Sequence, residues 1–223
     1  TYTGGNLNVG SHTLSIGGAG TFSNATGSPL VLDVADSILS LTGNGTISGP
    51  VKLESGKLKS TGSPTVSGAM TQYSDATIEV STNQTLTYSG APFSLGANTL
   101  TLTGGGTLMS GGLDLNNANS KLLLNSITVD SVSTTVDNSL GVDVDNDSTI
   151  TSLSVANITP VSIASGKTLS GAITVTAGSL KLTEAGTLAS SVSMSGGVLD
   201  ADNSSTLSGT LTQAGNITID VAD

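Results

Sequence analysis

The sequence predicts an all-β protein: one right-handed parallel β-helix over residues 1–223, with about ten coils of about 20 residues and three short strands per coil. Three observations predict it. Pairs of alternating aliphatic residues return at a nearly constant spacing from one end to the other. A triplet of Thr, an aliphatic residue and Ser or Thr recurs between these pairs. The chain has only three Tyr and two Phe, so its core must be thin and made of stacked Val, Leu and Ile.

The aliphatic pair is the first predicted strand of each coil. Short alternation of apolar and polar residues is the signal of a strand with one buried face. We therefore expect the aliphatic residues inside and the residues between them outside, with Lys59 beside Glu79 and Lys181 beside Asp200 on neighbouring coils. The pairs begin at Leu14, Leu39, Leu58, Ile78, Leu100, Leu122, Val142, Val161, Leu180, Leu199 and Ile217.

The Thr-containing triplet is the second predicted strand. Its first and third residues share a face, so stacking predicts one exposed file of hydroxyl groups along the β-helix. Such a face is either a polar outer surface or a surface that orders water and binds ice or glycan. The predicted file consists of Thr46, Thr65, Thr85, Thr107, Thr149, Thr168, Thr187 and Thr206.

A third alternation follows in many coils, as in the segments that begin at Val51, Leu113 and Ile173. Gly, Asn, Ser and Asp separate the three segments and suit corners, because they tolerate positive φ or turn conformations. The segment from Asn24 to Leu30 enlarges the first coil and predicts a loop. No helical period is present, and β-branched residues are abundant.

Composition limits the classes of function. All six basic residues are lysine, and the net charge of −10 argues against nucleic-acid binding, which needs a basic face. The absence of cysteine excludes disulfides and thiolate metal sites. No apolar run is long enough for a membrane span. An acidic chain rich in Ser and Thr predicts an extracellular or cell-surface location, and Thr1 in place of Met predicts a removed leader or a fragment.

The densest acidic cluster contains Asp143, Asp145 and Asp147. Alternate carboxylates on a strand could hold calcium, or they could be an ordinary acidic strand that enters a corner. We expect no other cofactor. Polysaccharide-active enzymes are an alternative because they also use parallel β-helices, but this chain has no Arg and a single His, His12, so we expect no enzyme.

The segments Gly105–Leu115 and Ala185–Leu188, which combine Gly, Thr and Leu, resemble the repeats of autotransporter passengers and filamentous-haemagglutinin-type adhesins. The resemblance covers nearly the whole chain. It implies a secreted, surface-displayed parallel β-helix that acts as a stalk, adhesin or fibre, and it transfers no binding residue.

The last residues of the sequence also predict how the chain associates with other segments. Residues 217–221 still alternate as a strand, and an uncovered strand edge pairs readily with another chain. We therefore expect a segment of a longer surface protein or a subunit that stacks end to end. Its partners would be neighbouring solenoid segments or copies of itself, with a glycan or host surface as a further partner. The expected function is structural or adhesive.

Overall fold

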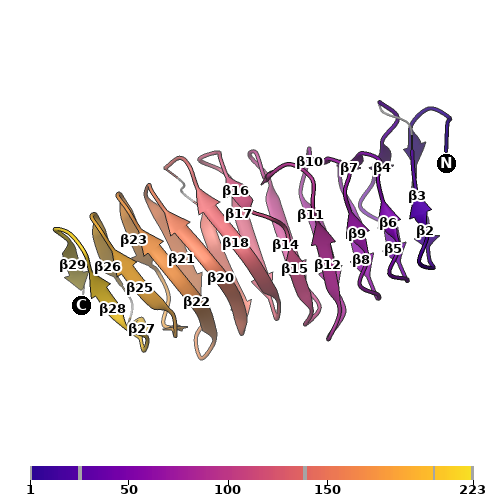
Figure 1. The fold of residues 1–223 in the computed structure, drawn as a ribbon. Helices are drawn as coiled ribbons and strands as arrows, with labels where there is room; N and C mark the ends of the chain where they lie inside the picture. Colours follow the sequence, from indigo (N-terminus) through magenta and orange to yellow (C-terminus); the bar gives the residue numbers. More distant parts are fainter. Residues whose placement is uncertain (1, 25–26, 138–139, 203, 222–223) are drawn as a thin grey trace.

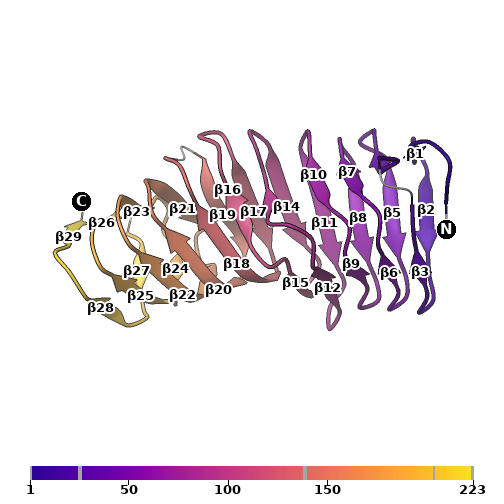
Figure 2. The ribbon, with the colours of Figure 1, turned by 45° about the horizontal axis from the view of Figure 1, so that its top comes forward.

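The computed structural model describes residues 2–24, 27–137, 140–202 and 204–221. Within these ranges the chain is all β, without a helix, and every pairing between its strands is parallel. The coils stack along one axis, with the two termini at opposite ends of the stack (Figures 1 and 2). Each coil contributes strands to three faces, so the predicted parallel β-solenoid with three strands per coil is confirmed.

The first face is an eleven-stranded sheet among the described residues. Its strands are the aliphatic pairs of the sequence, and it runs in order from one end of the solenoid to the other (Figure 2). It contains β2 (Thr13–Ile16), β5 (Ile38–Leu41), β8 (Lys57–Ser60), β11 (Ala76–Val80), β14 (Thr99–Thr103), β17 (Lys121–Asn125), β19 (Gly141–Asn146), β21 (Thr159–Ile163), β23 (Ser179–Leu182), β26 (Val198–Ala201) and β29 (Thr218–Val221).

The second face contains the Thr triplets. Three of its strands are long and turn the corner into the third face, so the two faces share one sheet in the middle of the solenoid. The second face contains β3 (Thr21–Phe22), β6 (Thr46–Ile47), β9 (Thr65–Val66), β12 (Thr85–Tyr88), β15 (Thr107–Met109), the long strands β18 (Thr128–Thr134), β20 (Ser148–Val155) and β22 (Thr168–Val175), and β24 (Thr187–Leu188) and β27 (Thr206–Leu207).

The third face has two parts. A four-stranded sheet comes first, with β1 (Leu7–Asn8), β4 (Leu30–Leu32), β7 (Val51–Leu53) and β10 (Met70–Gln72). The second part contains β13 (Phe93–Ser94), β16 (Leu113–Leu115), the ends of the long strands, β25 (Ser191–Met194) and β28 (Leu211–Gln213).

The two parts of the third face meet at a seam between β10 and β13. No strand pairing joins these two strands in the part of the chain that the structure describes. The backbone N–H of Met70 instead donates to the hydroxyl of Tyr88, 3.1 Å away. The ring of Tyr88 is buried and meets Phe93 edge to face, with 6.1 Å between the ring centroids. A phenol oxygen therefore takes the place of a carbonyl that a regular ladder would supply.

The core is a set of aliphatic stacks, as the sequence predicts. Leu122 and Leu182, from two coils of the first face, have exposed fractions of 0% and 2%. Ser60 takes an aliphatic position and is also fully buried, and its hydroxyl donates to the carbonyl of Gly62 at 2.8 Å. Burial of this polar group is tolerated because its hydrogen bond is made inside the coil.

The coil-to-coil register differs from the sequence prediction at three places on the first face. Leu100 lies opposite Ala76 rather than Ile78. Leu180 lies opposite Thr159 rather than Val161, and Leu199 lies opposite Ile219 rather than Ile217. Each difference is two residues, so the same side chains stay on the same face of their strands. The predicted burial is nevertheless wrong for Ile219, which is 52% exposed in β29. Of the predicted loop from Asn24 to Leu30, Ala25 and Thr26 lie outside the described residues.

Candidate functional site

The eight threonines of the predicted hydroxyl file all lie at or near the starts of strands on the second face. Seven of them are half-buried, and Thr206 is exposed. They do not form one file. Thr65 lies opposite Thr87 rather than Thr85, and Thr149 lies opposite Ser170 rather than Thr168. The prediction of a single continuous file is therefore wrong in register at two places.

Three shorter hydroxyl files result. The first runs through Thr21, Thr46, Thr65 and Thr87 and ends at Met109. The second runs through Thr85, Thr107, Thr128, Thr149 and Ser170. The third runs through Thr168, Thr187 and Thr206.

A local structural feature accompanies each shift of register. In β12, Tyr88 lies opposite Val66, which places its ring against Phe93 and its hydroxyl at the N–H of Met70. Between β20 and β22 the register changes near Ile150, opposite Gly171. Gly171 has a φ of 129°, which glycine adopts without strain. The hydroxyl face is therefore divided at two places. One is at β12, where the ring of Tyr88 packs against Phe93, and the other is between β20 and β22, where the register is irregular.

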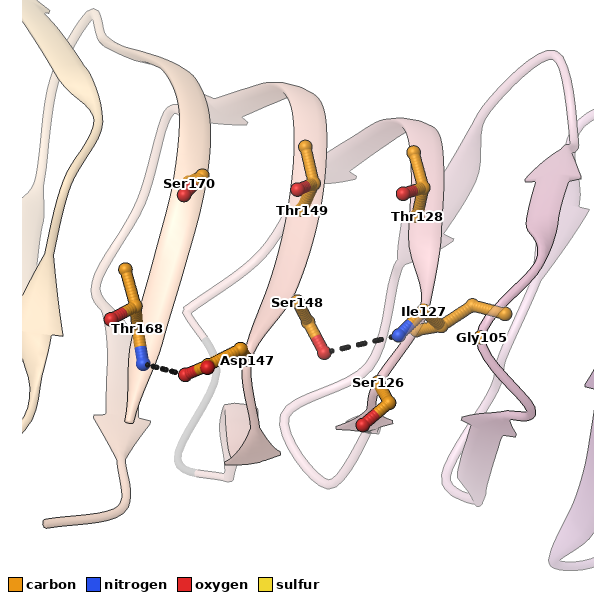
Figure 3. A pocket seen from close by; sticks show the side chains of 9 residues that line it. All are labelled: Gly105, Ser126, Ile127, Thr128, Asp147, Ser148, Thr149, Thr168 and Ser170. Atoms are coloured by element: carbon orange, nitrogen blue, oxygen red, sulfur yellow. Dashed lines mark hydrogen bonds between the residues drawn. The ribbon is translucent and has the colours of Figure 1, made fainter. Parts of the chain in front are cut away.

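The second file borders an open polar hollow of about 530 Å³ (Figure 3). The hydroxyl groups of Thr128, Thr149 and Ser170 lie in a row on three successive strands, as Figure 3 shows. These three hydroxyl groups form no hydrogen bond with the part of the chain that the structure describes. They are therefore available to water or to a polyhydroxylated ligand.

Two other polar side chains of this hollow are used within the fold. The carboxylate of Asp147 accepts a hydrogen bond from the backbone N–H of Thr168 at 2.8 Å. The hydroxyl of Ser148 donates to the carbonyl of Asn146 at 2.8 Å and accepts from the N–H of Ile127 at 3.3 Å. Both side chains fix a corner between coils. No histidine lines this hollow among the described residues, so the hollow offers hydrogen bonds but no general base of that kind.

The acidic residues suggested for calcium have different roles. Asp143 lies on β19 and forms an ion pair with Lys121, with 2.5 Å between Oδ2 and Nζ. Asp145 is exposed, and Asp147 is turned towards Thr168. No group of three acidic or histidine residues gathers around a common point in the described ranges.

The predicted charge pairs between coils are confirmed, and each has a third member. Glu79 contacts Lys59 at 2.9 Å and Lys57 at 2.7 Å. Hydrogen bonds from Lys57 and Lys59 lower the pKa of Glu79 below its ordinary value. Lys181 contacts Asp200 and Asp202, each at 2.9 Å, and hydrogen bonds to these carboxylates raise its pKa. These ion pairs hold neighbouring coils in register.

One surface feature was not predicted from the sequence. Tyr73 follows β10 and is 60% exposed, between two hollows at the seam of the third face. The sequence contains one sign of an exposed position: Tyr73 is one of only five aromatic residues, and the polar residues Ser74 and Asp75 follow it.

The chain matches no protein-family model, no curated protein and no solved structure. Among the described residues there is no helix long and apolar enough to cross a membrane.

Proposed function

We propose that this chain is a structural and adhesive segment of an extracellular microbial surface protein, and that it is not an enzyme. The observation that carries the proposal is the first face. Among the described residues its eleven strands pair in sequence order from β2 to β29. Ten inter-strand steps of about 4.8 Å give a rod about 48 Å long. A protein built this way gains length in proportion to its number of coils.

The outer surface of the solenoid also suits a structural segment such as a stalk. Ser and Thr occupy most outward positions of the second face, and ion pairs such as Lys59–Glu79 connect neighbouring coils. A composition rich in Ser and Thr, with a net charge of −10, supports an extracellular location.

The proposed partners are further solenoid coils, in the same polypeptide or in another copy. On β29, Ile219 and Val221 are 52% and 70% exposed, and a further parallel strand would cover them. A host surface or glycan is the proposed partner for adhesion through the sides of the rod.

Electron microscopy of the purified chain tests the rod. We expect unbranched rods about 50 Å long, or filaments with that axial repeat if copies stack. Beads coated with the chain should attach to host cells or to a glycan surface better than beads coated with albumin. Compact particles without elongation, or specific cleavage of a polysaccharide in a turnover assay, would overturn the proposal.

A second candidate function rests on the free hydroxyl groups of Thr128, Thr149 and Ser170. Their parallel strands space them by about 4.8 Å, and such a row can order water, ice or a glycan. Thermal hysteresis, or the binding of any glycan that binds to this row of hydroxyl groups, should then be lost in a Thr128→Tyr/Thr149→Tyr variant. The exposed Ser193 on the third face provides the matched control, Ser193→Tyr. Equal behaviour of both variants would remove this candidate.

A further inference from the structure

Tyr73 is unusual in this chain because aromatic side chains are scarce and the core uses two of the five. Tyr88 and Phe93 are buried at 2% and 1%, whereas Tyr73 is 60% exposed. No other aromatic residue is among the exposed large apolar side chains that the structure describes. An exposed aromatic ring that borders a concave surface is a frequent component of ligand sites, because it offers a rigid apolar face.

Two hollows flank this ring. The first has a volume of about 660 Å³, is bordered by Asn6, Ser48, Pro50 and Lys52, and lies over the four-stranded sheet. The second has a volume of about 360 Å³ and is bordered by Tyr88 and Pro92, at the seam between β10 and β13. Ala69, Thr71 and Tyr73 border both. The two hollows therefore meet the same residues beside the seam where the strand ladder is interrupted, and together they are called the Tyr73 depression.

The backbone around Tyr73 is fixed. Its N–H donates to the carbonyl of Leu53 at 2.8 Å. The side-chain amide of Gln72 donates to the carbonyl groups of Ser74 at 3.0 Å and Thr99 at 2.8 Å. Because the backbone here is already ordered, only the side chain of Tyr73 has to lose conformational freedom when a ligand binds.

The border of the larger hollow is equally fixed. The amide of Asn24, which is 7% exposed, donates to the carbonyl groups of Ser28 at 2.7 Å and Pro50 at 3.1 Å. The hydrogen bonds on both sides of the depression are therefore formed without a ligand.

The charge at this site is positive, in contrast to the chain as a whole. Lys52 is the only charged residue among the described residues that border the larger hollow. Its ammonium lies 5.1 Å from the centroid of the Tyr73 ring. It forms no ion pair with any carboxylate that the structure describes, whereas Lys57, Lys59, Lys121 and Lys181 all do. Lys52 can therefore bind an anionic group without breaking an existing ion pair.

We propose that the depression around Tyr73 binds an acidic saccharide, a sugar that carries a carboxylate or a sulfate. The apolar face of the sugar ring packs against Tyr73, and the anionic group binds the ammonium of Lys52. The hydroxyl of Thr71 and the amide of Asn6 border the same hollow and can hydrogen-bond the sugar hydroxyl groups. The hydroxyl of Ser48 lies 2.8 Å from that of Ser23 and can make one further hydrogen bond to the sugar. This site is on the third face and is independent of both the rod function and the hydroxyl files of the second face.

The test uses an array of oligosaccharides in matched pairs, each acidic glycan (sialylated, uronate-containing or sulfated) beside its neutral counterpart. We expect the chain to retain acidic members over their neutral counterparts. Calorimetry with the best acidic glycan should then give an affinity at least about tenfold lower for Tyr73→Ala and for Lys52→Gln. Lys52→Gln should leave binding of the neutral counterpart unchanged, because only the charge is removed.

Two controls distinguish a loss of this site from unfolding and from binding on the second face. Tyr73 and Lys52 lie outside the core, so both variants should unfold at the same temperature as the wild-type chain. Thr128→Tyr/Thr149→Tyr, on the second face, should bind the acidic glycan normally. The proposal fails if no acidic glycan is preferred, or if binding survives in Tyr73→Ala and Lys52→Gln or is lost in the second-face variant.

Discussion

Asp130 holds Ser110 of the preceding coil through one carboxylate oxygen, which accepts from the backbone N–H of Ser110 at 2.9 Å and from its hydroxyl at 2.8 Å. The second oxygen accepts from the N–H of Gly111 at 3.0 Å. The same arrangement recurs in simpler form, as when Asp75 accepts from the N–H of Thr99 and Asn116 from the N–H of Gly96. Acidic and amide side chains at corners therefore connect coils where the strand ladder is absent.

The Asp130 contact predicts a dependence of stability on pH. Burial raises the pKa of Asp130, but the hydrogen bonds from Ser110, Gly111 and Ser131 outweigh burial and lower the pKa overall. A carboxyl group with a lowered folded pKa stabilises the protein fully above its unfolded pKa of about 3.9, and this stabilisation is lost as the pH falls through the folded value. Urea unfolding should show this loss for the wild-type chain, and Asp130→Asn should reduce it.

At pH 7, we expect Asp130→Ala to lower the free energy of unfolding by about 1–3 kcal/mol, because charged hydrogen bonds are lost and backbone donors are left without a partner. Asp145→Asn, at an exposed position, is the control and should change stability little. Equal effects of the two variants would show that the Asp130 contact is not stabilising.

The Lys57–Glu79–Lys59 group should contribute modestly because its members are partly exposed. We expect Glu79→Gln to lower the free energy of unfolding by about 0.5–1 kcal/mol at low salt, and by less at high salt, where charges are screened. A double-mutant cycle between Glu79→Gln and Lys59→Met measures the pair directly. A coupling energy of zero at low salt would contradict the prediction.

The first face allows a matched test of which side chains point inward. Leu122→Asp would bury an unpaired charge in a dry core and should prevent folding. Leu123→Asp, one residue further along β17, places the same charge on the outer surface, where Leu123 is half-buried, and should leave a folded protein. Circular dichroism distinguishes the two, and similar spectra for both variants would contradict the assigned faces.

Close approach between coils makes some corner glycines irreplaceable. A Cβ at Gly68 would lie 1.9 Å from the carbonyl oxygen of Gly49, on the neighbouring coil, whereas a Cβ at Gly20 would have nothing within 4 Å. We expect Gly68→Ala to lower the free energy of unfolding by at least about 1–3 kcal/mol and Gly20→Ala to have little effect. Thermal unfolding of both variants checks this difference.

The repeat was sufficient to predict the architecture, the buried aliphatic residues and the charge pairs, because the alternation of side chains fixes which residues face inward. It could not fix the register. A slip of two residues keeps every side chain on its face, so Leu100 opposite Ala76 and Leu100 opposite Ile78 satisfy the pattern equally. The length of each corner decides between them, and that length depends on local packing such as the contact of Tyr88 with Phe93.

The prediction of one continuous hydroxyl file was wrong for the same reason. Thr85 and Thr87 are both outward on β12, and the repeat pattern does not distinguish which one continues the file from Thr65. The depression at Tyr73 could not be predicted because it depends on an interruption of strand pairing. No repeat pattern in the sequence reveals that interruption.

The seam between β10 and β13 has a mechanical consequence. Elsewhere on the third face, rows of backbone hydrogen bonds resist separation of neighbouring coils, but at the seam the resistance on that face comes from side chains such as Tyr88. Under a bending force the solenoid should therefore flex first at this joint, opening on the third face while the continuous first-face sheet acts as the hinge. A molecule bound beside Tyr73 would sit at the joint, so tension on the rod would change the shape of its binding site.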